Sequence, residues 1–216
     1  MQPTKTTILT LALLAACGGT ASADIIGFDV SVDTGSLAGT SGGIYLAFSP
    51  GFNADPASLS ISGFTPLAGL PGGPAFTDGG VSGTLDTGDL VFTNYLYALN
   101  DYGEALSFGL TLSFRASFDL PHTLTGNSGS ELDVQITESD LLTPLLTSDP
   151  SGNIVEISYD YTGAFTATAT SQYATVTQAD AVPEPAMASI LAVLAVVFAG
   201  IRLVRIRRCE AAQGRG

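Results

Sequence analysis

The chain has very little cysteine, histidine or tryptophan. Its 216 residues include Cys17, Cys209 and the single His122, and there is no tryptophan. Both cysteines lie outside residues 24–177, so that region has no intramolecular disulfide framework and no cysteine-based metal site. His122 lacks the further histidines that a zinc site requires, and no Gly-x-Ser-x-Gly elbow presents a nucleophilic serine. We therefore interpret His122 as a solvated residue at a strand end.

Basic residues are also nearly absent between residues 24 and 181. Of the seven lysines and arginines only Arg115 lies in this segment, whereas 18 of the 20 aspartates and glutamates do, so its net charge is −17. Such a surface repels nucleic acid and attracts cations. The charge also has a simpler interpretation, because carboxylates alone can keep an exported β-protein soluble.

The N-terminus is typical of a secretory signal peptide spanning residues 1–23. Lys5 is the only charge before Asp24, residues 8–16 are apolar, and Ala21-Ser22-Ala23 offers a small-x-small cleavage site. This pattern predicts cleavage by signal peptidase between Ala23 and Asp24. A second interpretation stays open, since residues 14–17 fit a lipobox in which Cys17 would become the lipidated N-terminus.

The C-terminus predicts one transmembrane helix over residues 186–204. Residues 186–201 are almost wholly apolar and would form about 24 Å of helix, against about 30 Å of hydrocarbon. Leu203 and Val204 extend the run. The positive-inside rule then places residues 205–216 in the cytoplasm, because four arginines follow the run: Arg202, Arg205, Arg207 and Arg208. The alternative, a buried core helix, does not account for these arginines.

A short extended segment precedes the apolar run. In Val182-Pro183-Glu184-Pro185 the two prolines lack backbone donors and force the residues before them into extended geometry. Residues 178–185 therefore form a linker with an accessible Pro-Glu-Pro tripeptide.

Together, the tripeptide, the helix and the arginine cluster resemble the PEP-CTERM sorting tail. The resemblance implies recognition by an exosortase, a membrane enzyme of Gram-negative bacteria that often accompanies exopolysaccharide production. It also implies an inner-membrane precursor with a periplasmic ectodomain, followed by release to the cell surface or extracellular matrix. The chain departs from the pattern in one respect, because residues 209–216 extend beyond the arginines.

The remaining segment, residues 24–177, is predicted to be a single β-domain. Residues 106–120 alternate strictly between apolar and polar side chains, which places every apolar residue on one face of a strand. Such a strand exceeds the usual length, so we expect a bend at Gly109. Shorter runs of the same kind predict further strands at residues 28–33, 44–48, 59–61, 90–93, 132–136, 155–161, 165–169 and 173–177.

Turn residues separate these runs, notably at residues 39–43, 50–51, 126–129 and 149–152. Many short strands with one apolar face each favour an antiparallel β-sandwich, and we expect a jelly-roll-like strand order. Residues 62–83 are rich in glycine and proline, and we expect a long surface loop there, with at most a short strand.

The opening of this domain carries a second resemblance. Residues 28–39 follow the pattern Phe-x-Val-x-Val-x-Thr-x-x-Leu-x-Gly, and residues 44–51 and 57–64 continue it. This is similar to an uncharacterised subgroup of PEP-CTERM proteins. The subgroup has no established activity, so the resemblance implies no catalytic residue.

Candidate chemistry is confined to carboxylates. Glu131 and Asp133 are spaced i, i+2, as are Glu138 and Asp140, so each pair would face one side of a strand and could in principle act on a glycosidic bond. The oxygen-rich turns at residues 86–89 and 149–153 could hold Ca²⁺, although neither matches an EF-hand loop. Solvated strand faces and ordinary turns account for all four features equally well.

The sequence therefore predicts no catalytic residue, no committed metal site and no resident cofactor. We expect a non-enzymatic exported surface or matrix protein, sorted by an exosortase. The alternative is a carbohydrate- or calcium-binding module of an exopolysaccharide matrix, and the third class is a secreted hydrolase.

Overall fold

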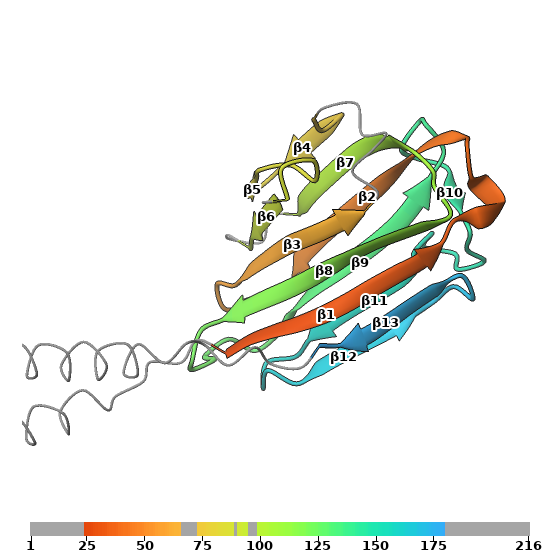
Figure 1. The fold of residues 1–216 in the computed structure, drawn as a ribbon. Helices are drawn as coiled ribbons and strands as arrows, with labels where there is room; N and C mark the ends of the chain where they lie inside the picture. Colours follow the sequence, from red (N-terminus) through yellow and green to blue (C-terminus); the bar gives the residue numbers. More distant parts are fainter. Residues whose placement is uncertain (1–23, 66–72, 89, 95–98, 180–216) are drawn as a thin grey trace, which may run out of the picture. The chain divides into compact units, whose positions relative to one another are not determined.

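The computed structural model describes residues 24–65, 73–88, 90–94 and 99–179 (Figure 1). These residues form β-strands, together with one short 3-10 helix at Gly35–Leu37. No helix within the described ranges is long and apolar enough to cross a membrane. The predicted signal peptide, the sorting motif, the transmembrane helix and the basic tail lie outside those ranges.

The strands form two sheets, and every pairing of named strands is antiparallel. Sheet A has the order β13 (Ala174–Gln178), β1 (Asp24–Asp33), β8 (Thr111–Leu120), β3 (Ser58–Thr65), β6 (Leu90–Thr93) and β5 (Val81–Ser82). Sheet B has the order β12 (Phe165–Ala169), β11 (Val155–Tyr159), β9 (Ser130–Thr137), β2 (Ser41–Pro50), β7 (Asn100–Ser107) and β4 (Phe76–Asp78), and β10 (Pro144–Leu145) pairs with β9.

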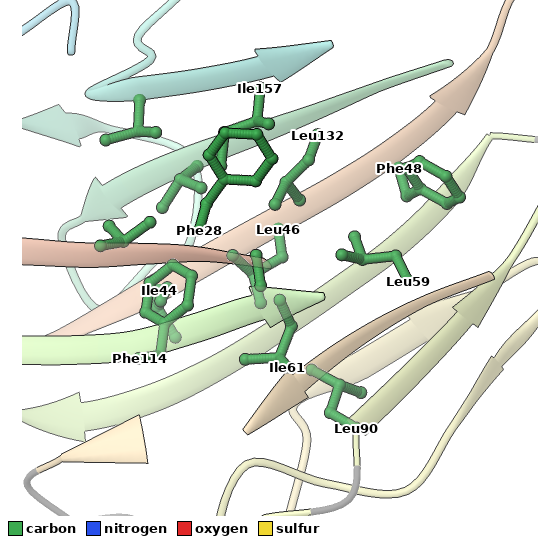
Figure 2. Close-up of a cluster of buried hydrophobic side chains, with 14 of the residues drawn as sticks. Phe28, Ile44, Leu46, Phe48, Leu59, Ile61, Leu90, Phe114, Leu132 and Ile157 are labelled. Carbon is green, nitrogen blue, oxygen red and sulfur yellow. The ribbon is translucent and has the colours of Figure 1, made fainter. Parts of the chain in front are cut away.

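One apolar core fills the space between the sheets (Figure 2). Period-two alternation turns one face of each long strand inward, so Leu46 on β2 and Leu132 on β9 oppose Leu59 on β3 and Phe114 on β8. Phe48 of sheet B meets Phe118 of sheet A edge-on, with ring centroids 6.0 Å apart. The prediction of an all-β antiparallel sandwich is confirmed at this level. The described core comes entirely from residues between 26 and 176.

The predicted bent strand over residues 106–120 is in fact two strands in different sheets. β7 ends at Ser107 in sheet B and β8 begins at Thr111 in sheet A, so the chain crosses between sheets at residues 108–110. The alternation breaks at this point, because Leu110 is 73% exposed. Hydrogen bonds join this crossing to the β1–β2 connection, where Thr34 donates through its N–H to Leu110 O (3.0 Å) and through its Oγ1 to Gly109 O (2.9 Å).

Two loop predictions need correction. The expected loop at residues 62–83 begins as strand, because β3 continues to Thr65 and buries Phe64, and β4 and β5 follow within it. A register shift between Ser62 and Thr65, with Gly63 at φ 62°, hides this strand from a simple alternation search.

The expected turn at residues 39–43 also contains strand, since β2 begins at Ser41. Gly42 and Gly43 lie within β2, and neighbouring side chains cover both of them closely. A Cβ at Gly42 would collide with the Phe108 ring, and one at Gly43 would collide with Leu141 Cδ2. Glycine is therefore needed at these two positions because it leaves room for the overlying side chains, and it does not mark a turn.

The first and last strands of the domain are neighbours in sheet A. β1 pairs with β13, and beyond β13 Ala179 N donates to Gly27 O (2.8 Å). β13 ends at Gln178, one residue beyond the predicted domain end at residue 177. The start of β1 and the end of β13 therefore lie side by side.

Candidate functional site

Three carboxylates gather on the outward face of sheet B. Glu131 and Asp133 lie on β9, and β11 brings Glu156 directly opposite Asp133. Each of the three can offer one carboxylate oxygen such that all three oxygens lie within 4.8 Å of one another. We call Glu131, Asp133 and Glu156 the acidic trio. The sequence predicts the Glu131–Asp133 pair, and the structure adds the third member.

A buried amide holds two members of the trio in place. Asn153 Nδ2 donates to Asp133 Oδ1 (2.7 Å) and to Glu156 Oε1 (2.9 Å). Asn153 Oδ1 in turn accepts from Gln135 Nε2 (3.0 Å), which also donates to Ser151 O (3.1 Å). The predicted oxygen-rich turn at residues 149–153 therefore adjoins the trio, through Asn153 and Gln135.

The trio is electrostatically uncompensated. Burial, followed by the charges of Glu131 and Glu156, raises the pKa of Asp133 to about 6, against an opposing hydrogen bond from Asn153. Burial, and then Glu156, also raises the pKa of Glu131. No lysine or arginine is available nearby, because the only one between residues 24 and 179 is Arg115 on β8 of sheet A. Like charges opposite one another on adjacent strands destabilise a sheet.

The negative charge continues across sheet B as a row of carboxylates. Pairing aligns Asp78 with Asp101, then Asp101 with the small Ala47, and Ala47 with Asp133. Tyr45 OH donates to Asp101 Oδ1 (2.8 Å), and burial is the main cause that raises the pKa of Asp101. The row therefore crosses the sheet from β4 to β11 and ends at the trio.

This arrangement suits a hard cation. Ca²⁺ takes six to eight oxygen ligands at about 2.3–2.6 Å, so two oxygens bound to one ion stand up to about 5 Å apart. The 4.8 Å limit within the acidic trio matches that geometry. The ligands would be Glu131, Asp133 and Glu156, and the absence of histidine and cysteine from the trio disfavours a transition metal.

The other predicted carboxylates accept hydrogen bonds from residues of the turns in which they lie. Asp140 accepts from Leu142 N and Thr143 N (both 2.9 Å), which lowers its pKa, and it is not joined to the trio. Asp149 accepts from Ser151 N (2.7 Å) in the same manner. Asp86 accepts from Thr84 Oγ1, and Asp89 lies outside the described residues. Neither predicted calcium turn assembles a separate ligand set within the part of the chain that the structure describes.

Arg115 and His122 occupy surface positions. Arg115 donates from Nε to Asp29 Oδ1 (2.8 Å) and from Nη2 to Asp29 Oδ2 (2.9 Å), across β8 and β1. This pair borders an open depression of about 530 Å³ on sheet A, and serine and threonine make up half of its lining residues. His122 is exposed in the connection after β8, as predicted.

The sorting residues lie outside the described ranges, except Asp24, which begins β1. This applies to Cys17, Ala21 and Ala23, to residues 182–185, and to the four arginines after the apolar run. The fold and the trio define an antiparallel two-sheet domain with an acidic face. Comparison of the chain with family models, with curated proteins and with solved structures gives no match.

The raised pKa of Asp133 predicts an unusual pH dependence of stability. The pKa of Asp133 is about 6 in the folded protein, against an ordinary value of 3.8. Above pH 6 the carboxylate is charged in both states, and its burial, together with repulsion from Glu131 and Glu156, opposes folding. As the pH falls from 7 toward 4, the folded protein binds the proton first, so this residue's destabilising contribution is lost.

We expect Asp133→Asn to melt about 2–4 °C above wild type at pH 7, which corresponds to about 1 kcal/mol after allowance for solvent screening. The difference should shrink toward pH 4. Melting curves of both proteins between pH 4 and pH 8 measure it, with Asp140→Asn as the control for an exposed turn carboxylate. A difference that stays constant with pH would show that the trio is not strained.

Proposed function

We propose that this chain is a non-enzymatic exported surface or extracellular-matrix protein, which an exosortase sorts through its PEP-CTERM tail. The observation that carries the proposal is the order of parts in the sequence. A secretory-type N-terminus precedes an acidic ectodomain, and Val182–Pro185, the apolar run and the arginines follow it.

Each part has a physical task in this proposal. Signal peptidase releases the N-terminus at Asp24, and the apolar run holds the precursor in the inner membrane with its arginines on the cytoplasmic side. The Pro-Glu-Pro tripeptide stays extended and accessible to the sorting enzyme. The ectodomain supplies a stable β-fold with an acidic surface.

Intact mass spectrometry of the protein, purified from both membrane and extracellular fractions, tests the sorting proposal. From cells that contain the exosortase, we expect a form that begins at Asp24 and lacks the residues after the Pro-Glu-Pro motif. From cells without it, the form should retain the tail through Gly216. A single mass in both strains would count against sorting, and a lipidated N-terminus at Cys17 would appear as a larger mass.

Calcium binding by the acidic trio is the second candidate function. It is favoured by three carboxylate oxygens within 4.8 Å of one another and by the absence of a lysine or arginine beside them among the described residues. Burial and then repulsion raise the pKa of Asp133, and a bound cation would relieve the repulsion. A carbohydrate ligand, the other form of this candidate, would find a surface rich in hydroxyls in the depression on sheet A.

Thermal melting in calcium or in chelator tests this second function. We expect millimolar Ca²⁺ to raise the melting temperature of residues 24–181, and Glu156→Gln to remove that response. Asp140→Asn should keep the response, because Asp140 is not part of the trio. Identical melting of wild type in calcium and in chelator would exclude a calcium site at the trio.

We also infer that the sandwich is a variant of the predicted jelly roll. The nested antiparallel pairs β1–β13, β2–β9 and β3–β8 support this, since they are the pairs that a rolled hairpin makes. The strand order differs from that of a jelly roll in sheet A, where β1 pairs with β8 in addition to β13.

A further inference from the structure

β13 forms an edge of sheet A that carries no charge. It pairs with β1 on one side, and Thr175 and Thr177 are exposed on the outward face. Residues 161–179, which include β12 and β13, contain no charged residue and no proline. In a segment of net charge −17 this is an exception, and proteins usually protect exposed edge strands with charges, prolines or bulges.

The hydrogen-bonding pattern between β1 and β13 determines which backbone groups of β13 point away from β1. Asp33 N donates to Tyr173 O (2.8 Å), and Ala179 N donates to Gly27 O (2.8 Å). In an antiparallel pair, hydrogen-bonded residues alternate along each strand. The N–H and C=O groups of Thr175 and Thr177 therefore face β1, whereas those of Val176 and Gln178 point away from it.

We propose that β13 is a self-association edge, to which a second copy of this chain adds its own β13 in antiparallel orientation. Centring the pair on Val176 places Val176 opposite Val176 of the second copy, and Ala174 opposite Gln178. The outward N–H and C=O groups of Val176 are then satisfied reciprocally, and the N–H of Gln178 meets the C=O of Ala174. A two-fold arrangement of this kind is self-complementary.

Charge favours β13 over the other uncharged edge. Pairing through β12 would bring β11 of both copies toward the joint, and β11 carries Glu156 of the uncompensated trio. Beside β13 the neighbouring strand β1 carries Asp29 near its middle, which Arg115 neutralises. The other carboxylates of β1, Asp24 and Asp33, lie at its two ends. Two copies of a strongly acidic domain can therefore approach through β13 with the least repulsion.

The opposite edges of the sheets are short, and that of sheet B is also acidic. β5 covers two residues and β4 three, and β4 ends at Asp78. Short edge strands and charged residues are features by which proteins prevent another strand from pairing with a sheet edge. Among the described edges, β13 thus combines outward backbone groups with an uncharged strand, which points to a second copy rather than to a charged polymer.

Sedimentation velocity of residues 24–181 over a range up to about 1 mM tests this proposal. We expect a monomer–dimer equilibrium that strengthens as salt rises from about 0.05 M to about 0.5 M, because salt screens the remaining repulsion. Val176→Pro removes an outward donor without breaking a bond to β1, and it should weaken the dimer by about tenfold or more.

Two further variants separate pairing from folding. Gln178→Pro removes the next outward donor from an exposed residue, so it should weaken the dimer even if Val176→Pro lowers stability. Ala167→Pro, the matched change on the β12 edge, should leave dimerisation unchanged. A domain that stays monomeric throughout, or a dimer that both β13 prolines leave intact, would overturn the proposal.

Discussion

Leu112→Asp should unfold the domain, whereas Ser113→Asp should leave it folded. Leu112 lies in the middle of β8 and is 1% exposed, with its side chain in the core between the sheets. Burying an unpaired carboxylate there costs several kcal/mol, and loss of the leucine adds about 2–5 kcal/mol. The sum is comparable with the whole stability of a domain, about 5–15 kcal/mol, so we expect the variant to be largely unfolded.

The neighbouring Ser113 is the matched control for this substitution. It lies on the outward face of the same strand, and its Oγ is 2.6 Å from Thr65 Oγ1, which can donate equally well to a carboxylate. Far-UV circular dichroism and thermal melting of residues 24–181 compare the two variants. Equal melting temperatures would mean that the two faces of β8 have been assigned the wrong way round.

Most strands could be predicted because their apolar and polar residues alternate without interruption. β6 and β12 have the bounds that the sequence predicts, and β9 extends its predicted core by a few residues. Alternation reports only which residues share a face. It does not report where a strand changes sheets, so residues 106–120 looked continuous although Leu110 is exposed at the crossing.

The first half of β7 was missed because polar residues occupy its inward positions. Asn100 is fully buried, where its Nδ2 donates to Phe48 O (2.9 Å) and its Oδ1 accepts from Gly80 N (2.7 Å). Glu104 is also fully buried and accepts a hydrogen bond from Tyr102 OH. Hydrogen bonds formed only in the folded state make Asn100 acceptable in the core, whereas Glu104 is only partly satisfied, because its Oε1 has no hydrogen-bond partner among the described residues.

The acidic trio could be predicted only in part. Glu131 and Asp133 share a strand face by spacing alone, which the sequence reveals. Glu156 joins them because β11 pairs with β9 in one particular register, with Glu156 opposite Asp133. The alternation of Val155, Ile157 and Tyr159 places Glu156 on the outward face. A shift by two residues would keep that face but move Glu156 away from Asp133, and nothing local in the sequence excludes it.

Replacing Pro183-Glu184-Pro185 with three alanines should abolish processing of the tail without affecting folding or membrane insertion. The described core comes from residues between 26 and 176, so the fold does not need the tripeptide. Insertion depends on the apolar run, and orientation depends on the arginines. An enzyme that recognises an extended peptide loses both its rigid backbone and the charge of Glu184, because alanines let the helix propagate outward.

Asp180→Ala is the matched control for the triple substitution. It removes one carboxylate from the same linker and leaves both prolines in place. It should be processed as wild type is, which would separate the effect of the motif from that of the linker's charge.

The most direct measurement of the sorting proposal is an immunoblot of membrane and extracellular fractions from cells that contain the exosortase. Wild type and Asp180→Ala should appear outside the cell as a shorter form, while the triple-alanine variant should stay in the membrane at full length and normal abundance. If the triple-alanine variant is shortened and released like wild type, the motif does not direct sorting and the proposed function is wrong.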